Sequence, residues 1–225
     1  LGVPIDVRGE PTDRPVTGAD LHRVTAIGAP AGRFDGLEVI CLCDVDNPLH
    51  GQDGAAHVFA PQKGATPQQV LQLDRGLKQV ATLSEFDAMR PSMGAAGGLA
   101  FGLQHAVATR VAPGAAFIAD ELGLDRALAG ADLCLTGEGQ FDETSLRGKV
   151  VSEVARRAKR AGVPCIVLAG AAKPFLDATD AGVTASLSIL HGPMSRDDAM
   201  EHAFDLLGAA TEQVMRTFVA GRGKS

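Results

Sequence analysis

The sequence predicts an α/β protein with an open parallel sheet in its second half. Two short apolar runs, "DLCLTG" from Asp132 and "CIVLAG" from Cys165, are typical of buried strands. Between them, Lys149 to Ala161 repeats apolar residues at helical spacing. Because strand-helix-strand crossovers are right-handed, this order predicts two parallel strands with the helix covering one face of their sheet.

The first half is less regular. Residues up to Gly36 are rich in Pro, Gly and Asp, which predicts loops with a strand or two. "LEVICLCDV" from Leu37 then predicts a buried strand that ends in the acidic turn "DVDNPLHGQDG". A helix is expected next, with Thr66 as its cap and Pro67 in its first turn. Its expected apolar side consists of Val70, Leu71, Leu73, Leu77 and Val80.

Further elements follow in order. The Gly/Ala-rich turn "MGAAGGLAFGL" from Met93 leads into another helix. In the helix from Lys149 to Ala161, we expect Val150, Val154 and Ala158 to face the core, and Arg156, Arg157, Lys159 and Arg160 to cover the other side. "ASLSIL" predicts a third strand, and a last helix is expected from Ser195, as its cap, to Phe218.

Composition limits the function. The chain has 225 residues, of which 45% are hydrophobic, enough for one large domain or two small ones. Only 4% are aromatic, which disfavours a stacking platform for single-stranded nucleic acid. The net charge of -6 also disfavours DNA, but it does not exclude a small phosphorylated ligand held by local donors and a metal ion.

The cysteines and the lack of targeting signals predict a cytoplasmic location. Cys41, Cys43, Cys134 and Cys165 each lie in apolar stretches, which favours buried structural thiols over a metal or redox site. No signal peptide and no apolar run of about 18 residues is present, so no membrane partner is expected. The chain starts with Leu1 rather than Met, consistent with a start inside a longer protein.

The segment "LTGEGQFDETSLRGK", from Leu135 to Lys149, predicts a ligand-binding loop. In a parallel sheet, ligands collect beyond the carboxyl ends of the strands. Glycines permit close approach of the backbone, a helix start attracts anions, and carboxylates suit Mg²⁺. The expected phosphate contacts are Thr136, Gly137, Gly139 and Ser145, the expected metal ligands are Glu138 and Asp142, and Lys149 adds positive charge. The alternative is a capped loop in which Asp142, Thr144 or Ser145 bonds nearby backbone.

Two loops of the first half add candidates. "CDVDNP" places Asp44, Asp46 and Asn47 after a strand, and "PQKGAT" adds Lys63, although Asx residues before a proline are also ordinary turn chemistry. The stretch "GAAGGL" could cradle an anion with backbone amides at Gly94, Gly97 and Gly98. It matches neither a Walker A motif nor a dinucleotide fingerprint.

Four stretches together resemble the glycerate kinase type I family. They are "CDVDNPLHGQDGAAHVFAPQKGAT", "MGAAGGLAFGL", "GADLCLTGEGQFDETSLRGKVVSEVARRAKRAGVP" and "ILHGPMS", and they occur in the family's order. The resemblance implies ATP-dependent phosphorylation of D-glycerate, usually at the 2-hydroxyl. It also implies a flavodoxin-like domain with a second α/β domain inserted into it, and an active site in the cleft between them.

By that resemblance, residues 1–112 form part of the inserted domain and residues 113–225 the C-terminal part of the flavodoxin-like domain. Glu138 and Asp142 would hold Mg²⁺ or its waters, and Lys149 and Lys63 would neutralise phosphate or carboxylate. Asp44 or Asp46 would orient or deprotonate the attacking hydroxyl.

The chain departs from the family pattern in several places. The family's N-terminal loops, such as "PDSFKG", "ADGGEGT" and "GGSATNDGG", do not occur, so we expect an N-terminal segment to be absent. The resulting unpaired sheet edge favours self-association. Gln140 replaces a usual basic residue, Phe141 a usual aliphatic one, and "AGAAKP" the usual "AGS" turn. The competing hypothesis is a non-catalytic ligand-binding or interaction module that retains the scaffold.

Overall fold

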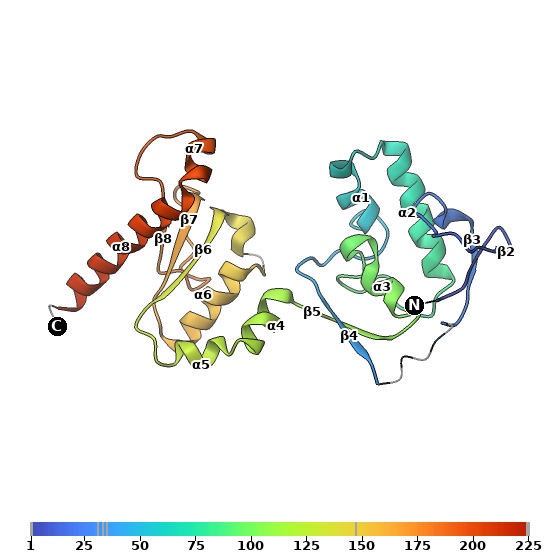
Figure 1. Cartoon of the computed structure of the whole chain (residues 1–225), viewed down its shortest axis with the longest axis horizontal. Helices are drawn as coiled ribbons and strands as arrows, with labels where there is room; N and C mark the ends of the chain where they lie inside the picture. Colours follow the sequence, from blue (N-terminus) through green and yellow to red (C-terminus); the bar gives the residue numbers. More distant parts are fainter. Residues whose placement is uncertain (1, 31, 33, 35, 147, 224–225) are drawn as a thin grey trace. The chain divides into compact units, whose positions relative to one another are not determined.

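The structure is a computed structural model that describes residues 2–30, 32, 34, 36–146 and 148–223. Its contacts divide the chain into two compact units, Leu1–Gly114 and Ala115–Ser225. Both units combine helices with parallel strands, so the predicted α/β class is confirmed (Figure 1).

The first unit contains two small sheets. One is antiparallel with the strand order β2-β1-β3, and the other pairs β4 with β5 in parallel. The elements are β1 (Ile5–Val7), β2 (Glu10–Pro11), η1 (Leu21–Arg23), β3 (Val24–Ile27), β4 (Glu38–Leu42), α1 (Ala55–Phe59), η2 (Pro61–Lys63), α2 (Pro67–Thr82), η3 (Ala95–Gly97), α3 (Leu99–Leu103) and β5 (Ala108–Ala112).

Helix α2 begins where the sequence predicts it. The Thr66 hydroxyl accepts a hydrogen bond from the Gln69 backbone amide, and the Gln69 side-chain oxygen accepts one from the Thr66 backbone amide, which completes a capping box. The expected apolar side is partly wrong, because Leu71 is 50% exposed. The buried side instead includes Gly76, where an added Cβ would lie 2.7 Å from Leu21. The close approach of η1 at this glycine sets which side of α2 is covered.

An aromatic cluster lies in the core of the first unit. Phe101 is fully buried, and Phe86 and His105 meet it edge-on, with ring centroids 6.5 and 5.7 Å away. The Nε2 atom of His105 is buried and has no hydrogen-bond partner among the described residues. Burial lowers the pKa of His105 from its ordinary value of 6.5, while the Glu85 carboxylate opposes this shift. The neutral imidazole therefore packs as part of the apolar core.

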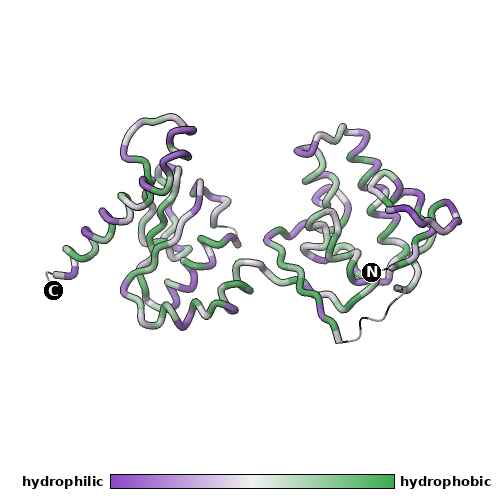
Figure 2. The backbone as a smooth tube through the Cα atoms, in the orientation of Figure 1, coloured by the Kyte–Doolittle hydropathy of each residue, from purple (hydrophilic) through white to green (hydrophobic). Residues whose placement is uncertain are grey.

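The second unit is built on a parallel sheet with the order β6-β7-β8. The strands of this sheet are largely apolar, whereas the C-terminal helix mixes apolar and hydrophilic residues (Figure 2). The elements are α4 (Gly114–Glu121), α5 (Leu124–Leu128), β6 (Cys134–Phe141), η4 (Glu143–Leu146), α6 (Val150–Ala161), β7 (Cys165–Ala172), β8 (Ala185–Ser188), α7 (Arg196–Glu201) and α8 (Ala203–Arg222).

Helices pack on both faces of this sheet. Helix α6 buries Val151, Ala155 and Ala158 against one face, while α8 buries Ala210 and Val214 against the other. The expected crossover helix is confirmed. The prediction that Val150 faces the core is wrong, because Val150 is 60% exposed and its neighbour Val151 is buried instead. Val154 is partly buried at the edge of the same cluster.

Arg157 is a second correction on α6. We expected it on the outer side, yet its side chain is only 4% exposed. It pairs with Glu153 at 2.6 Å and Asp120 at 2.7 Å, and it donates to the Ala116 carbonyl at 3.1 Å. Hydrogen bonds to Glu153 and Asp120 raise its pKa further. The cation is buried because its partners on α4 and α6 replace water.

The end of the chain forms two helices rather than one. Ser195 caps α7, as predicted, by accepting from the Asp198 amide at 3.1 Å. The helix then breaks at His202, and α8 runs to Arg222, beyond the predicted end. In the described part of the chain, no helix combines the length and apolar character needed to cross a membrane.

The four cysteines are free thiols. Cys134 and Cys165 are buried as predicted and are register partners in β6 and β7. Cys41 and Cys43 are only partly buried, which departs from the prediction.

Replacing Arg157 with alanine should lower the free energy of unfolding by about 3 kcal/mol, because the largely buried Glu153 carboxylate would lose its buried partner and keep only the half-exposed Arg156. Urea denaturation measures the change. Arg156→Ala is the matched control, since Arg156 pairs with the same Glu153 but is 50% exposed; its loss should stay within about 1 kcal/mol. Equal losses of unfolding free energy in the two variants would show that the burial of Arg157 adds nothing to stability.

The lowered pKa of His105 predicts a pH-dependent stability. Neutral His105 contributes to the free energy of unfolding in full above pH 6.5, the ordinary pKa of histidine in the unfolded chain. This contribution is lost as the pH falls through the lower pKa of the folded protein, because the unfolded chain binds the proton first. His105→Phe should therefore reduce the fall in urea midpoint between about pH 7 and pH 5. His191 is exposed, so His191→Phe is the control and should leave the change of urea midpoint with pH as in the wild-type chain. The same change in His105→Phe as in the wild-type chain would refute the role of His105.

Candidate functional site

The segment predicted as a glycine-containing loop is the end of a strand. Strand β6 continues through Phe141 and pairs with β7 as far as Ala172. A Cβ at Gly137 would lie 2.3 Å from the Leu168 carbonyl oxygen, and one at Gly170 would lie 2.7 Å from the Gly139 oxygen. Gly137 and Gly170 are thus required for the close approach of the two strands. The sequence had instead predicted close approach of a ligand, at Gly137 and Gly139.

The polar turn begins after this strand. The Asp142 carboxylate accepts hydrogen bonds from the backbone amide and the hydroxyl of Thr144, at 2.8 and 2.7 Å, and from the side-chain Nε2 of Gln140 at 3.2 Å. The Thr144 hydroxyl in turn accepts from the Lys149 ammonium at 2.9 Å. The Thr144 hydroxyl contributes most to lowering the pKa of Asp142, so this carboxylate stays ionised. We call residues 142–146, 148 and 149 the Asp142–Lys149 turn.

Ser145 closes the inside of the Asp142–Lys149 turn. It is fully buried, accepts from the Asp142 amide at 3.0 Å and donates to the Gln140 carbonyl at 3.4 Å. These are the contacts of the capped-loop alternative. They also hold Asp142, Thr144 and Lys149 in one fixed arrangement at the carboxyl end of β6.

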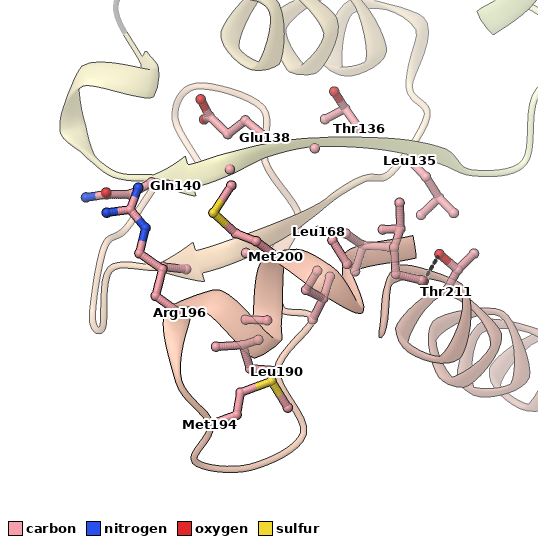
Figure 3. Close-up of a pocket in the computed structure, with 18 of the residues that line it drawn as sticks. Leu135, Thr136, Glu138, Gln140, Leu168, Leu190, Met194, Arg196, Met200 and Thr211 are labelled. Atoms are coloured by element: carbon pink, nitrogen blue, oxygen red, sulfur yellow. Dashed lines mark hydrogen bonds between the residues drawn. The ribbon is translucent and has the colours of Figure 1, made fainter. Parts of the chain in front are cut away.

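Glu138 lies on β6 just before the turn. Its Oε1 atom is buried and has no hydrogen-bond partner among the described residues. Figure 3 shows Glu138 and Thr136 on the opposite side of β6 from Met200 and Leu190. A buried carboxylate oxygen without a donor favours a cation, so Glu138 fits a metal-binding role.

The described residues contain no group of three or more His, Cys, Asp or Glu side chains placed to hold a metal. Mg²⁺ does not need one, because it commonly binds one or two carboxylates and completes its shell with water and phosphate oxygens. The carboxylates of Glu138 and Asp142 meet that smaller requirement in number and chemistry.

A large cavity lies beside β6 on the α7 and α8 side. Its volume is 1220 Å³, above the range of about 300–1,000 Å³ typical of small-molecule sites. Its lining is mainly apolar, including Leu190, Met194 and Met200 (Figure 3). The polar members are Thr136, Glu138, Gln140, Ser195, Arg196 and Thr211. Four of the predicted site residues, Thr136, Gly137, Glu138 and Gly139, also line this cavity. The lining residues of α7 and α8 were not predicted, although "ILHGPMS" at the end of the third strand pointed to their position.

The first unit brings the acidic turn and the glycine-rich turn together. The Gly94 amide donates to the Asn47 carbonyl at 2.8 Å, and a Cβ at Gly94 would lie 2.2 Å from the Pro48 oxygen. Asp44 and Asp46 are both exposed, and Asp44 Oδ1 accepts a hydrogen bond from the Gly114 amide at 2.9 Å. Lys63 ends η2 and is also exposed.

The expected anion cradle is already filled by backbone oxygens at three positions. The amides of Gly94, Gly97 and Gly98 donate to the carbonyls of Asn47, Gly94 and Ala95, respectively. Gly97 and Gly98 both have positive φ, and a Cβ at Gly98 would lie 2.5 Å from Leu49. These glycines are explained by the geometry of the turn.

A family model decides the relationship of the chain. The model described as the glycerate kinase family matches residues 1–219. The chain belongs to the glycerate kinase family. The resemblance seen in the sequence motifs is therefore confirmed.

Named relatives agree with the family. The glycerate kinase of Haemophilus influenzae is 34% identical over 214 residues, which cover 91% of this chain and 57% of the relative. The glycerate 2-kinase of Escherichia coli is 32% identical and matches 80% of this chain and 49% of its own length. A crystal structure of a protein assigned as glycerate kinase 2 from Salmonella typhimurium LT2 has a TM-score of 0.78 and 32% identity, covering 99% of this chain and 60% of that one. The chain thus spans about half the length of the curated relatives.

Proposed function

We propose that the chain carries out, or forms part of a protein that carries out, ATP-dependent phosphorylation of D-glycerate to 2-phosphoglycerate in the cytoplasm. The observation that carries the proposal is the family match over residues 1–219. The name of the E. coli relative, glycerate 2-kinase, supports transfer of the phosphoryl group to the 2-hydroxyl. The flavodoxin-like architecture with an inserted domain is proposed on the same resemblance.

The Asp142–Lys149 turn is proposed as the phosphate-binding side of the reaction. It lies at the carboxyl end of a parallel strand, where such folds bind ligands, and Lys149 brings a positive charge. Asp142 and Glu138 would hold Mg²⁺, which supplies charge neutralisation to the phosphates. Thr136 and the backbone of Gly139 lie on the same strand and are proposed as further contacts.

The exposed pair Asp46 and Lys63 is proposed for the acceptor. Asp44 already accepts a hydrogen bond from Gly114, so Asp46 is assigned to the attacking hydroxyl and Lys63 to the glycerate carboxylate. In the transfer, the glycerate oxygen forms a bond to the γ-phosphorus while the bond to the ADP oxygen breaks. The hydroxyl proton passes to the Asp46 carboxylate.

A coupled ADP-release assay with D-glycerate tests the function, and phosphorus NMR identifies the product. We expect ADP release and a phosphate on the 2-hydroxyl when the natural reading frame is expressed to its full extent. The 225-residue chain alone should turn over poorly, because donors are needed on both sides of the transferred phosphoryl group.

Two other results would have different consequences, the first against the kinase proposal and the second against the poor turnover expected of the 225-residue chain. Binding of MgATP or glycerate by calorimetry without turnover in the full reading frame would support the non-catalytic module. Efficient turnover by the 225-residue chain would show that its own residues already form a complete site.

Glu138→Gln should weaken Mg²⁺-dependent ADP binding while leaving the melting temperature within a few degrees, because it removes the charge of an otherwise unpartnered oxygen. Calorimetry across a magnesium titration measures the effect. The matched control is Glu212→Gln on α8, where the carboxylate pairs with Arg216 outside the turn. An unchanged magnesium dependence in Glu138→Gln would remove this residue from the metal site.

A further inference from the structure

Phe175 combines full exposure with an unusual backbone. Its side chain is 105% exposed, and its φ is 60°, in the left-handed region. That conformation is rare for a bulky residue and tends to persist where function requires it. An exposed aromatic ring at such a position calls for an explanation beyond chain reversal, which glycine would perform better.

The segment before Phe175 is fixed to the proposed phosphate-binding side. The Lys173 amide donates to the Phe141 carbonyl at 2.9 Å, and the Lys173 ammonium pairs with the Glu143 carboxylate in η4. Two residues of chain reach at most about 7 Å, so the backbone of Phe175 stays close to this anchor. Glu143 is next to Thr144, the residue that holds Lys149.

The surroundings favour a small flat ligand over a protein partner. Phe175 lies among exposed Lys173, Pro174 and Asp177, and the neighbouring Leu176 is partly buried against the core. Protein interfaces need a contiguous area of about 1,000 Å² or more, which one exposed ring does not provide. Phe141, the other aromatic residue at this edge, is completely buried. The lining of the large cavity contains no aromatic side chain. Phe175 therefore offers an exposed π face within reach of the Asp142–Lys149 turn.

We propose that Phe175 stacks on the purine base of the nucleotide whose phosphates bind the Asp142–Lys149 turn. This inference rests on the proposed function and assigns the base a contact outside the apolar cavity. Aromatic side chains stack on nucleobases through their π faces, and such stacking tolerates base identity. The strained backbone then has a purpose, since it presents the ring outward from a turn held by Lys173.

The sequence contains no Trp or Tyr, so Phe175→Trp creates a single tryptophan reporter. We expect adenosine and MgADP to quench its fluorescence, and inorganic tripolyphosphate to leave it unchanged. Phe204→Trp is the matched control, because Phe204 is 89% exposed on α8 and lies outside the cavity lining. Its fluorescence should respond to none of the three ligands.

Affinity provides an independent readout. Phe175→Leu should weaken MgADP binding about tenfold by calorimetry, the loss expected for one stacking contact. Phe204→Leu should bind as the wild-type chain does. Phe175→Gly should lose the same affinity without a fall in melting temperature, because glycine accepts the positive φ.

The outcomes separate this inference from the proposed function. If wild-type protein binds MgADP but Phe175→Trp is not quenched and Phe175→Leu binds normally, the stacking inference is overturned. Weakened MgADP binding in Met200→Glu would then place the base in the cavity. If no variant binds nucleotide, the ATP proposal fails and the inference fails with it. Adenosine quenching without glycerate phosphorylation by the full reading frame would support both stacking and the non-catalytic module.

Discussion

The parallel pairing of β6 with β7 is the constraint on which the second unit depends. The pairing runs through seven register partners, from Cys134 and Cys165 to Phe141 and Ala172, and then continues when the Lys173 amide donates to Phe141. Gly137 and Gly170 permit it, since a side chain at either position would collide with the neighbouring backbone. Because the strands remain paired to this point, the Asp142–Lys149 turn after β6 and the segment from Lys173 after β7 leave the sheet side by side at its carboxyl edge.

A buried ion-pair network fixes the helices on one side of this sheet. Arg157 connects α6 to α4 through Asp120, and a second carboxylate, Asp125 of α5, lies 3.2 Å from its guanidinium. The pair with Glu153 is the most enclosed part, with both side chains at least partly buried. Such a network contributes less to net stability than its charge suggests, because desolvation opposes the attraction. The network also fixes how α4, α5 and α6 pack against one another. Apolar contacts alone would define that packing less specifically.

Local signals were read correctly from the sequence, and errors arose where tertiary contacts decide the outcome. Thr66 and Ser195 cap helices because their hydroxyls meet amides three residues away, so the sequence contains the whole interaction. Burial of Arg157 depends on Asp120 in another helix, which spacing cannot reveal. The glycines of "TGEG" resemble a loop locally, but the close approach of β7 makes them part of a strand. Site residues were similarly ambiguous: the sequence placed Asp142 and Lys149 in one polar turn, yet gave no sign that Glu138 would have an unpartnered oxygen.

The structural and functional interpretations of the Asp142–Lys149 turn are compatible. Preorganised donors stabilise charge best when their own positions are fixed by further hydrogen bonds. Ser145 and Thr144 provide such bonds, holding Asp142 ionised and Lys149 close to it. A turn that only ended a strand would need neither the lysine nor the anchored, exposed ring of Phe175 nearby. The same hydrogen bonds that stabilise the turn would therefore lower the reorganisation required when a phosphorylated ligand binds.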